Sequence, residues 1–154
     1  MTIFLEWGAF CMTEKNVYVA GTWDLFHPGH VNILRESKKL GRVIVAVSTD
    51  ELIEHVKGER PTMCLDERIE VLNACKYVDC VVIQEKILDI KQLKEMKVDI
   101  IVVGTDWVNK KNDGIDWLKE NDGCIVYLPY TKGVSTTEIR ERIRNGAKTI
   151  NQRN

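Results

Sequence analysis

A regular alternation between short β-branched runs and longer amphipathic stretches limits the possible folds of this chain more than any other feature. Residues 42–48 (RVIVAVS) and 100–104 (IIVVG) are nearly continuous apolar runs, which are typical of strands buried on both faces of a parallel sheet. Strands that alternate with helices predict right-handed crossover connections. We therefore predict a single-domain, Rossmann-like α/β fold, with a doubly wound parallel sheet of about five strands and helices on both faces. We expect strands at 16–20, 42–48, 80–83, 100–104 and 124–128, and helices at 31–40, 65–74, 89–96, 114–120 and 136–144.

Length and charge restrict the function classes that remain open. The 154 residues suit one compact domain, and we interpret residues 1–11 as an N-terminal extension and residues 12–154 as the functional domain. The formal net charge is -1, so we expect no bulk electrostatic attraction to nucleic acid or to an anionic membrane. An anionic ligand must therefore be held by a local cluster of residues.

Apolar runs and cysteines bear on the compartment in which the chain works. No apolar run approaches the ~18 residues that a membrane-spanning helix needs, so we predict no membrane insertion. The five cysteines include no C-x-x-C pair, which favours reduced thiols, and we expect most of them to be buried as small hydrophobic residues. Together these features predict a cytoplasmic protein.

The segment after the first expected strand, GTWDLFHPGH at 21–30, predicts a phosphate site. A strand-to-helix turn exposes free backbone N–H groups at the positive end of the helix dipole, and Gly29 lacks the Cβ that would keep a phosphate away. His27 and His30 form an H-x-G-H pair whose imidazoles can donate hydrogen bonds to phosphate oxygens as charge develops on a leaving group. The alternatives are two unconnected structural histidines, or a zinc site with further ligands that the nearby sequence does not supply.

A second helix N-terminus is expected near the end of the chain. Ser135 and Glu138 fit a capping box, S-x-x-E, at the start of the helix at 136–144. Ser135, Thr136 and Thr137 would supply hydroxyl and backbone N–H donors there, and two such termini facing one cleft would suit a triphosphate. The alternative is a plain helix cap without a ligand.

Four segments together resemble one known family. GTWDLFHPGH resembles the G-T-F-D-x-x-H-x-G-H signature of the cytidylyltransferases, within the nucleotidyltransferase α/β phosphodiesterase superfamily. KYVD at 76–79 resembles that family's R-Y-V-D segment, and GVSTTEIR at 133–140 resembles its G-I-S-T-T-x-I-x segment. GTDW at 104–107 resembles the G-D-D-W segment of glycerol-3-phosphate cytidylyltransferases. The resemblance covers residues 16–144, and the segments agree with the family in order and spacing.

The resemblance implies a nucleotidyltransferase that moves CMP from CTP to a small phospho-alcohol, with glycerol 3-phosphate favoured, giving CDP-glycerol and pyrophosphate. It also implies Mg²⁺ carried with the nucleoside triphosphate, and a homodimer with the 76–79 segment near the subunit contact. His27 and His30 would stabilise the α- and β-phosphates and the leaving group. Lys57, which we place in a flexible loop at 56–61, would bridge the attacking and attacked phosphates; the alternative is a solvated loop lysine.

The same resemblance assigns further residues to binding roles. For Asp24 the alternative to nucleotide binding is a side chain that stabilises the turn. For Trp23 the alternative is a packing role, which we also expect for Trp117. Arg60 is a weaker candidate for the site, and Arg68 is expected to brace the fold by pairing with an acid. The residues expected to bind the nucleotide are Gly21, Thr22, Trp23, Asp24, Gly29, Lys76, Asp79, Gly104, Asp106 and, at the β- and γ-phosphates, Ser135, Thr136 and Thr137, whereas those expected to bind the acceptor are Lys57, Trp107 and Lys132.

Several positions depart from the family pattern and keep other functions open. Tyr130 stands where the family's R-T-E-G segment has arginine, and a cation follows two residues later at Lys132. Lys76 replaces the arginine of R-Y-V-D, and Thr105 replaces the first aspartate of G-D-D-W. Arginine and lysine are not interchangeable as phosphate ligands. Two alternatives therefore stay open: an adenylyltransferase of the same fold acting on FMN or a sugar 1-phosphate, and a non-catalytic nucleotide-binding module.

Overall fold

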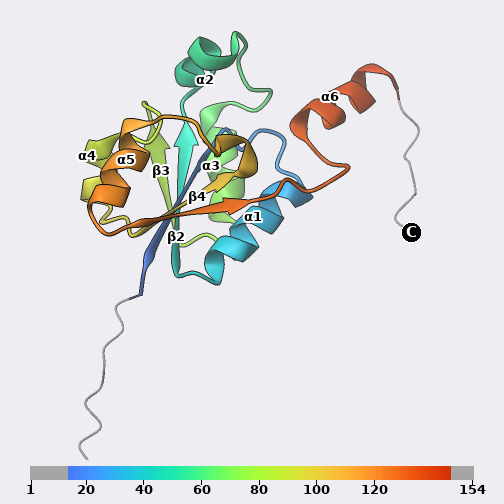
Figure 1. Ribbon diagram of the computed structural model, residues 1–154. Helices are drawn as coiled ribbons and strands as arrows, with labels where there is room; N and C mark the ends of the chain where they lie inside the picture. Colours follow the sequence, from blue (N-terminus) through green and yellow to red (C-terminus); the bar gives the residue numbers. More distant parts are fainter. Residues whose placement is uncertain (1–13, 147–154) are drawn as a thin grey trace, which may run out of the picture.

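Five strands form the central sheet of the computed structural model, which describes residues 14–146 (Figure 1). The strands are β1 (Asn16–Gly21), β2 (Arg42–Ser48), β3 (Cys80–Gln84), β4 (Ile100–Gly104) and β5 (Cys124–Leu128). Every neighbouring pair is parallel, in the order β3–β2–β1–β4–β5, so the strand order reverses between β1 and β4. Sheets of this kind bind ligands beyond the carboxyl ends of the strands at the reversal. The predicted fold class is confirmed.

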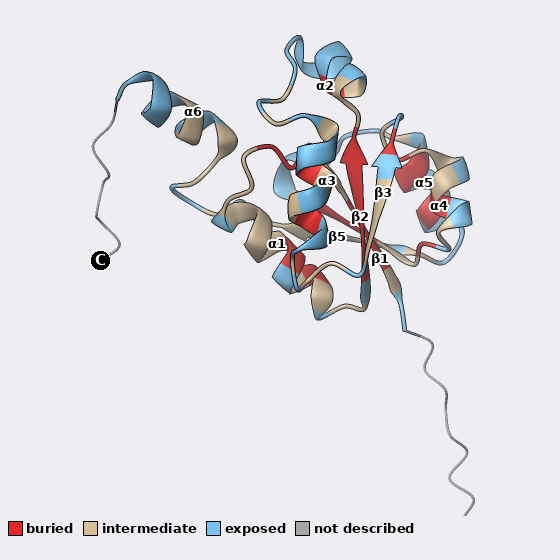
Figure 2. Cartoon of the chain, turned by 180° about the vertical axis from the view of Figure 1, so that it is seen from behind, coloured by how far each residue is buried: buried red, intermediate tan, exposed pale blue. Residues whose placement is uncertain are grey.

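Helices cover both faces of the sheet (Figure 2). They are α1 (Pro28–Lys38), α2 (Asp50–Lys57), α3 (Leu65–Asn73), α4 (Ile90–Glu95), α5 (Asp113–Glu120) and α6 (Thr136–Arg144), with a 3₁₀ helix η1 (Thr105–Trp107). On one face, Leu34 of α1 and Leu72 of α3 join the core cluster that contains Val17. On the other face, Leu93 of α4 and Leu118 of α5 join a separate cluster. Helix α6 stands away from both layers, beside the carboxyl edge of the sheet (Figure 1).

The burial of β2 explains the apolar run that the sequence shows there. Every residue of β2 after Arg42 is buried, and Val43, Ile44 and Val45 are at most 1% exposed. The strand pairs with β1 on one edge and β3 on the other, so no edge of it is left open. Full burial of an aliphatic side chain contributes about 1.5–3 kcal/mol. The strand ends that meet at the carboxyl edge are therefore held firmly in place.

Helix α2 replaces the loop that was expected around Lys57. Thr49 caps this helix, because its hydroxyl oxygen accepts a hydrogen bond from the Leu52 N–H at 3.1 Å. Gly58 ends the helix with a φ of 81°, a left-handed conformation that glycine adopts without strain. The expectation of a flexible loop over 56–61 is therefore wrong for Lys57, which is the last residue of α2. The helix is only eight residues long, but Leu52, Ile53 and Val56 recur at helical spacing, so the sequence did carry a signal for it.

Four of the five cysteines lie within the described residues, where they are free but not buried. The expectation of buried cysteines is therefore wrong for these four. Cys64 immediately precedes α3 and Cys124 begins the edge strand β5, and both are exposed. The predicted extension at 1–11, which includes Cys11, lies outside the described residues. Within residues 14–146, no helix is long and apolar enough to cross a bilayer.

Candidate active site

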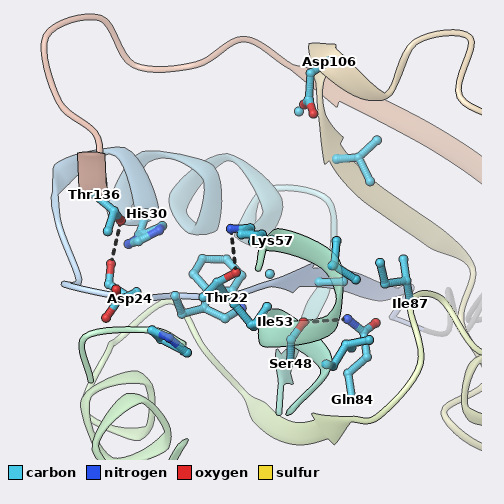
Figure 3. Close-up of a pocket in the computed structure, with 18 of the residues that line it drawn as sticks. Thr22, Asp24, His30, Ser48, Ile53, Lys57, Gln84, Ile87, Asp106 and Thr136 are labelled. Carbon is cyan, nitrogen blue, oxygen red and sulfur yellow. Dashed lines mark hydrogen bonds between the residues drawn. The ribbon is translucent and has the colours of Figure 1, made fainter. Parts of the chain in front are cut away.

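A cavity of about 510 Å³ lies beyond the carboxyl ends of the strands (Figure 3). Its base comes from residues at the ends of β1, β2, β3 and β4, and its sides come from α2, the segment at 59–61, η1 and α6. The cavity therefore opens where the strand order reverses, which is the position that this fold favours for a ligand. Its volume is in the range of small-molecule sites.

The histidine pair lies on one side of this cavity, at the start of α1. His27 caps the helix, because its Nδ1 accepts a hydrogen bond from the Gly29 N–H at 3.1 Å. An accepting Nδ1 places the ring proton on Nε2, which leaves that N–H as a donor. The ring of His30 stacks on that of His27, with the centroids 3.8 Å apart, and His30 lines the cavity. Among the described residues, His30 Nδ1 is buried without a hydrogen-bond partner.

Both imidazoles are neutral at pH 7. Burial lowers the pKa of His30 to about 3, and the neighbouring His27 adds to this shift. Burial also lowers the pKa of His27, against an opposing effect of Glu138. A neutral imidazole carries one N–H donor and can bind an anionic oxygen without being protonated first. Two such donors at a helix N-terminus suit an oxygen on which negative charge develops.

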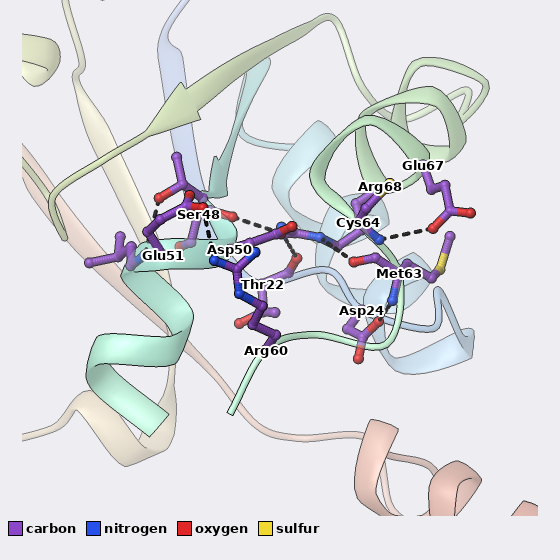
Figure 4. Close-up of polar contacts among 12 residues, drawn as sticks. Thr22, Asp24, Ser48, Asp50, Glu51, Arg60, Met63, Cys64, Glu67 and Arg68 are labelled. Carbon is purple, nitrogen blue, oxygen red and sulfur yellow. Dashed lines mark hydrogen bonds and ion pairs between the residues drawn. The ribbon is translucent and has the colours of Figure 1, made fainter. Parts of the chain in front are cut away.

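Lys57 reaches from the end of α2 to the segment at 21–30 that joins β1 to α1, which we call the phosphate turn. Its Nζ donates to Thr22 Oγ1 at 3.1 Å, and both residues line the cavity (Figure 3). Arg68 holds the backbone nearby, because its guanidinium donates to the carbonyl oxygens of Thr22 at 2.6 Å and Ser48 at 2.8 Å. The same side chain is 0% exposed and pairs with Asp50 at the start of α2 (Figure 4). The expectation that Arg68 braces the fold through an acid is confirmed.

Asp24 ties the phosphate turn to two other segments. Its carboxylate accepts hydrogen bonds from the backbone N–H groups of Thr62 at 2.9 Å and Met63 at 2.8 Å. Its carbonyl oxygen accepts one from Thr136 Oγ1 at 2.9 Å (Figure 3). Burial alone would raise the pKa of Asp24, but the two N–H groups and Arg140 hold it below its usual value. These contacts support the turn-stabilising alternative for the Asp24 side chain over direct contact with a nucleotide.

Helix α6 brings a second N-terminus and one unpredicted cation to the cavity. Ser135 Oγ accepts a hydrogen bond from the Glu138 N–H at 3.1 Å, so the Ser135 half of the predicted capping box is confirmed. Arg140 lines the cavity and donates to Asp24 at 2.9 Å and to Glu59 at 2.5 Å. The sequence does carry a signal for Arg140, since it lies one helical turn after the first residue of α6 and hence on the same face.

On the opposite side of the cavity, beyond β4, polar side chains bind one another. The Tyr130 hydroxyl donates to Asp106 at 2.7 Å, and Lys110 Nζ donates to the same carboxylate at 2.9 Å. Lys110 also lies over the Trp107 ring, 5.0 Å from its centroid. A Cβ on Gly104 would lie 2.6 Å from Asp106 Oδ1 and 2.9 Å from the Tyr130 hydroxyl, so a larger residue there would displace these two side chains. Burial, and then Asp106, raise the pKa of Tyr130 to about 12.

The structure brings most of the predicted binding residues to one cavity. His27, Gly29 and Ser135 do not line it but contact or cap the elements that do. Trp23 lines it, yet its side chain is mostly buried and its Nε1 donates to the Ala46 carbonyl at 3.1 Å, as a packing residue would. The predicted residues that line the cavity are Gly21, Thr22, Trp23, Asp24, His30, Lys57, Gly104, Asp106, Trp107, Thr136 and Thr137.

Three predicted binding residues do not reach the cavity. Lys76 and Asp79 immediately precede β3, and segments that enter parallel strands lie at the opposite edge from segments that leave them. Asp79 there pairs with Lys38 at 2.6 Å and accepts from the Val43 N–H at 2.8 Å. Lys132 is exposed between β5 and α6 and does not line the cavity. The geometry therefore does not support nucleotide contact for Lys76 and Asp79 or acceptor contact for Lys132.

Two helix N-termini, a neutral histidine pair and a lysine thus meet at the strand-order reversal of a parallel sheet. This arrangement defines an α/β protein suited to a phosphate-rich nucleotide. The model of the Cytidylyltransferase-like family matches residues 18–142. The chain belongs to this family, which places it among the nucleotidyltransferases.

Individual relatives agree with this membership. The chain is 39% identical over 132 residues to the glycerol-3-phosphate cytidylyltransferase of Bacillus subtilis, covering 84% of this chain and 97% of that protein. It is 38% identical over 133 residues to the bifunctional protein HldE of Nitrosococcus oceani, but spans only 28% of that protein's length. Among solved structures, the lipopolysaccharide core biosynthesis protein from Thermoplasma volcanium superposes with a TM-score of 0.62 at 26% identity, covering 79% of this chain and 99% of that one. The pantoate-β-alanine ligase of Francisella tularensis, with a TM-score of 0.53 at 17% identity over 86% of this chain and 70% of that one, shares the fold.

Proposed function

We propose that the chain transfers CMP from MgCTP to the phosphate of a small phospho-alcohol and releases pyrophosphate. The observation that carries this proposal is the placement of His30, Lys57 and the N-terminus of α6 around one cavity. The favoured acceptor is glycerol 3-phosphate, with CDP-glycerol as the product. The similarity to a glycerol-3-phosphate cytidylyltransferase, which extends over 97% of that enzyme's length, supports this choice.

The reaction is an in-line displacement at the α-phosphorus of the nucleotide. An oxygen of the acceptor phosphate forms the new P–O bond while the bond from the α-phosphorus to the bridging oxygen breaks, and pyrophosphate leaves with that electron pair. No side-chain nucleophile is required, because a phosphate monoester is already ionised at neutral pH. The protein therefore contributes positioning and charge compensation.

The histidines and Lys57 supply the charge compensation in this proposal. The N–H donors of His27 and His30 bind the oxygens of the α- and β-phosphates, and these hydrogen bonds strengthen as the leaving oxygen becomes more negative. In the reaction, Lys57 leaves its contact with Thr22 and binds the attacking and attacked phosphates instead. Its positive charge reduces the repulsion between these two phosphates.

The N-terminus of α6 holds the far end of the triphosphate. Thr136 and Thr137 line the cavity there, with backbone N–H groups at the positive end of the helix dipole. Within residues 14–146, no three His, Cys, Asp or Glu side chains come together as a metal site. Mg²⁺ often keeps several waters and binds mainly to substrate phosphates, so in this proposal it enters as part of the MgCTP substrate.

The nucleotide base is assigned to the side of the cavity beyond β4. Asp106 offers a carboxylate acceptor and Trp107 an aromatic ring, and both line the cavity from the same 3₁₀ turn. These groups suit a base with an exocyclic amino group. Trp107, which the resemblance assigns to the acceptor, is therefore moved to the nucleotide in this proposal.

The similarity to HldE favours a second candidate, a nucleotidyltransferase that acts on a sugar phosphate. Pyrophosphate release by the purified protein with Mg²⁺ separates the two candidates. CTP and ATP are each combined with glycerol 3-phosphate, phosphocholine, phosphoethanolamine, a sugar 1-phosphate and FMN. We expect release with CTP and glycerol 3-phosphate. Release only with a sugar 1-phosphate selects the second candidate, and nucleotide binding without release in any combination identifies a non-catalytic module.

A further inference from the structure

Ser48 and Gln84 form the base of the cavity on the side of β2 and β3. They are the last residues of these strands and are 4% and 2% exposed. No sequence motif marks either residue, although each is a polar residue that ends an apolar run. Burying a polar group costs free energy unless it finds a hydrogen-bond partner. The hydrogen bonds of this pair therefore show what the cavity offers a ligand.

The orientation of the Gln84 amide is fixed by its neighbours. Its Oε1 accepts a hydrogen bond from the Leu88 N–H at 3.2 Å, which requires an oxygen at that position. Its Nε2 donates to Ser48 Oγ at 3.0 Å (Figure 3). The Tyr18 hydroxyl lies 3.4 Å from Gln84 Oε1 and donates to Gln92 Oε1 at 2.6 Å, which extends the polar network to Gln92. The amide therefore cannot flip without breaking the contact to Leu88.

This arrangement leaves two donors at the cavity. Ser48 Oγ acts as the acceptor for Gln84, so its own O–H is available to donate. Gln84 Nε2 has a second N–H besides the one given to Ser48. Within the part of the chain that the structure describes, neither proton has a hydrogen-bond acceptor. A ligand oxygen placed between these donors would satisfy both.

The surroundings of the pair disfavour a cation. Ile53 and Ile87 line the cavity beside the pair (Figure 3). The acidic residues that line the cavity within 14–146 are Asp24, Glu59 and Asp106, and each is already bound to a cation of the chain. An ammonium group entering beside Ser48 and Gln84 would therefore lose water without gaining a free carboxylate.

The position of the pair assigns it to the acceptor. The aromatic ring and carboxylate suited to a base lie beyond β4, whereas the pair lies at the ends of β2 and β3, across β1 in the sheet. Figure 3 shows Lys57 and Thr22 between this pair and the group formed by Asp24, His30 and Thr136. An acceptor whose phosphate meets Lys57 would direct its carbon chain away from the nucleotide and towards Ser48 and Gln84.

We propose that Ser48 and Gln84 determine acceptor specificity, by donating hydrogen bonds to a hydroxyl oxygen on the carbon chain of a hydroxylated phosphate ester. This inference rests on the proposed nucleotidyl transfer and adds the chemical class of the acceptor. Polyol phosphates and sugar phosphates share this chemistry, whereas phosphocholine and phosphoethanolamine do not.

Matched acceptors with and without hydroxyl groups test the proposal. Glycerol 3-phosphate is compared with propyl phosphate, and a hexose 1-phosphate with cyclohexyl phosphate, each with MgCTP. We expect the unaltered protein to prefer the hydroxylated member of the pair that it uses by at least about tenfold in kcat/KM, as loss of one or two hydrogen bonds predicts. Reaction with glycerol 3-phosphate identifies a polyol phosphate as the acceptor, and reaction with the hexose 1-phosphate identifies a sugar phosphate. Equal use of both members, or equal use of phosphocholine, would overturn the proposal.

Substitutions test whether the preference for a hydroxylated acceptor arises from Ser48 and Gln84. Gln84→Met and Ser48→Ala should each reduce the preference for the hydroxylated acceptor about three- to tenfold, while kcat/KM for its deoxy analogue and KM for CTP stay unchanged. Gln92→Met is the matched control, because Gln92 belongs to the same network but does not line the cavity, and it should keep the preference. A proportional loss with both acceptors would show a structural effect only and contradict the proposal.

Calorimetry separates this inference from the proposed function. If the unaltered protein releases no pyrophosphate with any acceptor, the proposed function fails. Direct titration of the free protein with glycerol 3-phosphate and propyl phosphate, and with the hexose 1-phosphate and cyclohexyl phosphate, then decides the inference. Tighter binding of a hydroxylated member that disappears in Gln84→Met supports it. Equal affinities within both pairs, or a difference that persists in the variant, overturn it.

Discussion

The two sides of the cavity are built in different ways. On the side of the phosphate turn, Arg68 and Asp24 are 0% and 3% exposed and hold backbone groups of three segments. On the side beyond β4, Tyr130 is 69% exposed, and its partner Asp106 and the Lys110 that pairs with Asp106 are also exposed. The first side is therefore fixed by the core, whereas the second consists of surface side chains that bind mainly one another. A surface group can change at little cost to the fold.

Two of the departures from the family pattern lie on the open side. The H-x-G-H pair on the buried side is intact, whereas Tyr130 and Thr105 lie on the open side. We infer that the phosphate chemistry depends on the rigid side, and that the choice of base can vary on the open side.

Arg68→Met should lower the free energy of unfolding by about 3–5 kcal/mol, because it leaves the Asp50 carboxylate and the carbonyl oxygens of Thr22 and Ser48 without their donor. Urea denaturation followed by circular dichroism measures this change. Lys110→Met is the control from the open side, since it also removes one partner of an ion pair, but an exposed one. The control should change stability by less than about 1 kcal/mol. Losses of similar size in both variants would remove the contrast between the two sides.

His27→Asn should lower kcat by about 10²–10³ with little change in stability. Asparagine keeps an acceptor for the N-cap position of α1, so the contact to the Gly29 N–H can persist, but it lacks the imidazole Nε2–H. Steady-state pyrophosphate release measures kcat, and thermal unfolding checks the fold. His27→Ala is the comparison: it should lose as much activity and in addition about 1 kcal/mol of stability with the cap. Full activity in His27→Asn would remove His27 from the mechanism.

Stability should fall on mild acidification because the half-buried His30 is held neutral in the folded chain. The folded pKa of His30 is about 3, below its ordinary value of 6.5, so between these values the unfolded chain binds the proton and the folded chain does not. The stabilisation is therefore present above about pH 6.5 and is lost as the pH falls towards 3. Between pH 7 and 5.5 the loss from one such group is about 1 kcal/mol. Urea denaturation at both pH values should show a smaller loss in His30→Gln, and an identical loss would contradict burial of a neutral imidazole.

The sequence predicted locally encoded features better than contacts between distant segments. Continuous apolar runs marked β2 and β4, and the H-x-G-H spacing marked the turn between β1 and α1, because both depend on local sequence. The roles of Arg140, Ser48 and Gln84 depend on contacts between segments far apart in the chain, which no local pattern encodes. The misplacement of Lys76 and Asp79 has a related cause. A matching segment gives a residue's position in the chain, whereas the edge of the sheet on which it lies follows from the topology.

Tyr130→Phe should have the smallest effect, because it removes only one exposed hydroxyl that donates to Asp106. We expect a change in stability below about 1 kcal/mol and a change in KM for CTP below about fivefold. Tyr130→Arg restores the residue of the family's R-T-E-G segment, and it should lower KM for CTP without changing kcat, since an arginine there can contact both Asp106 and a phosphate. Kinetics with CTP and ATP measure both variants. A fall in kcat comparable to that of His27→Asn would place Tyr130 in the chemical step, and the two sides of the cavity would then not differ in function.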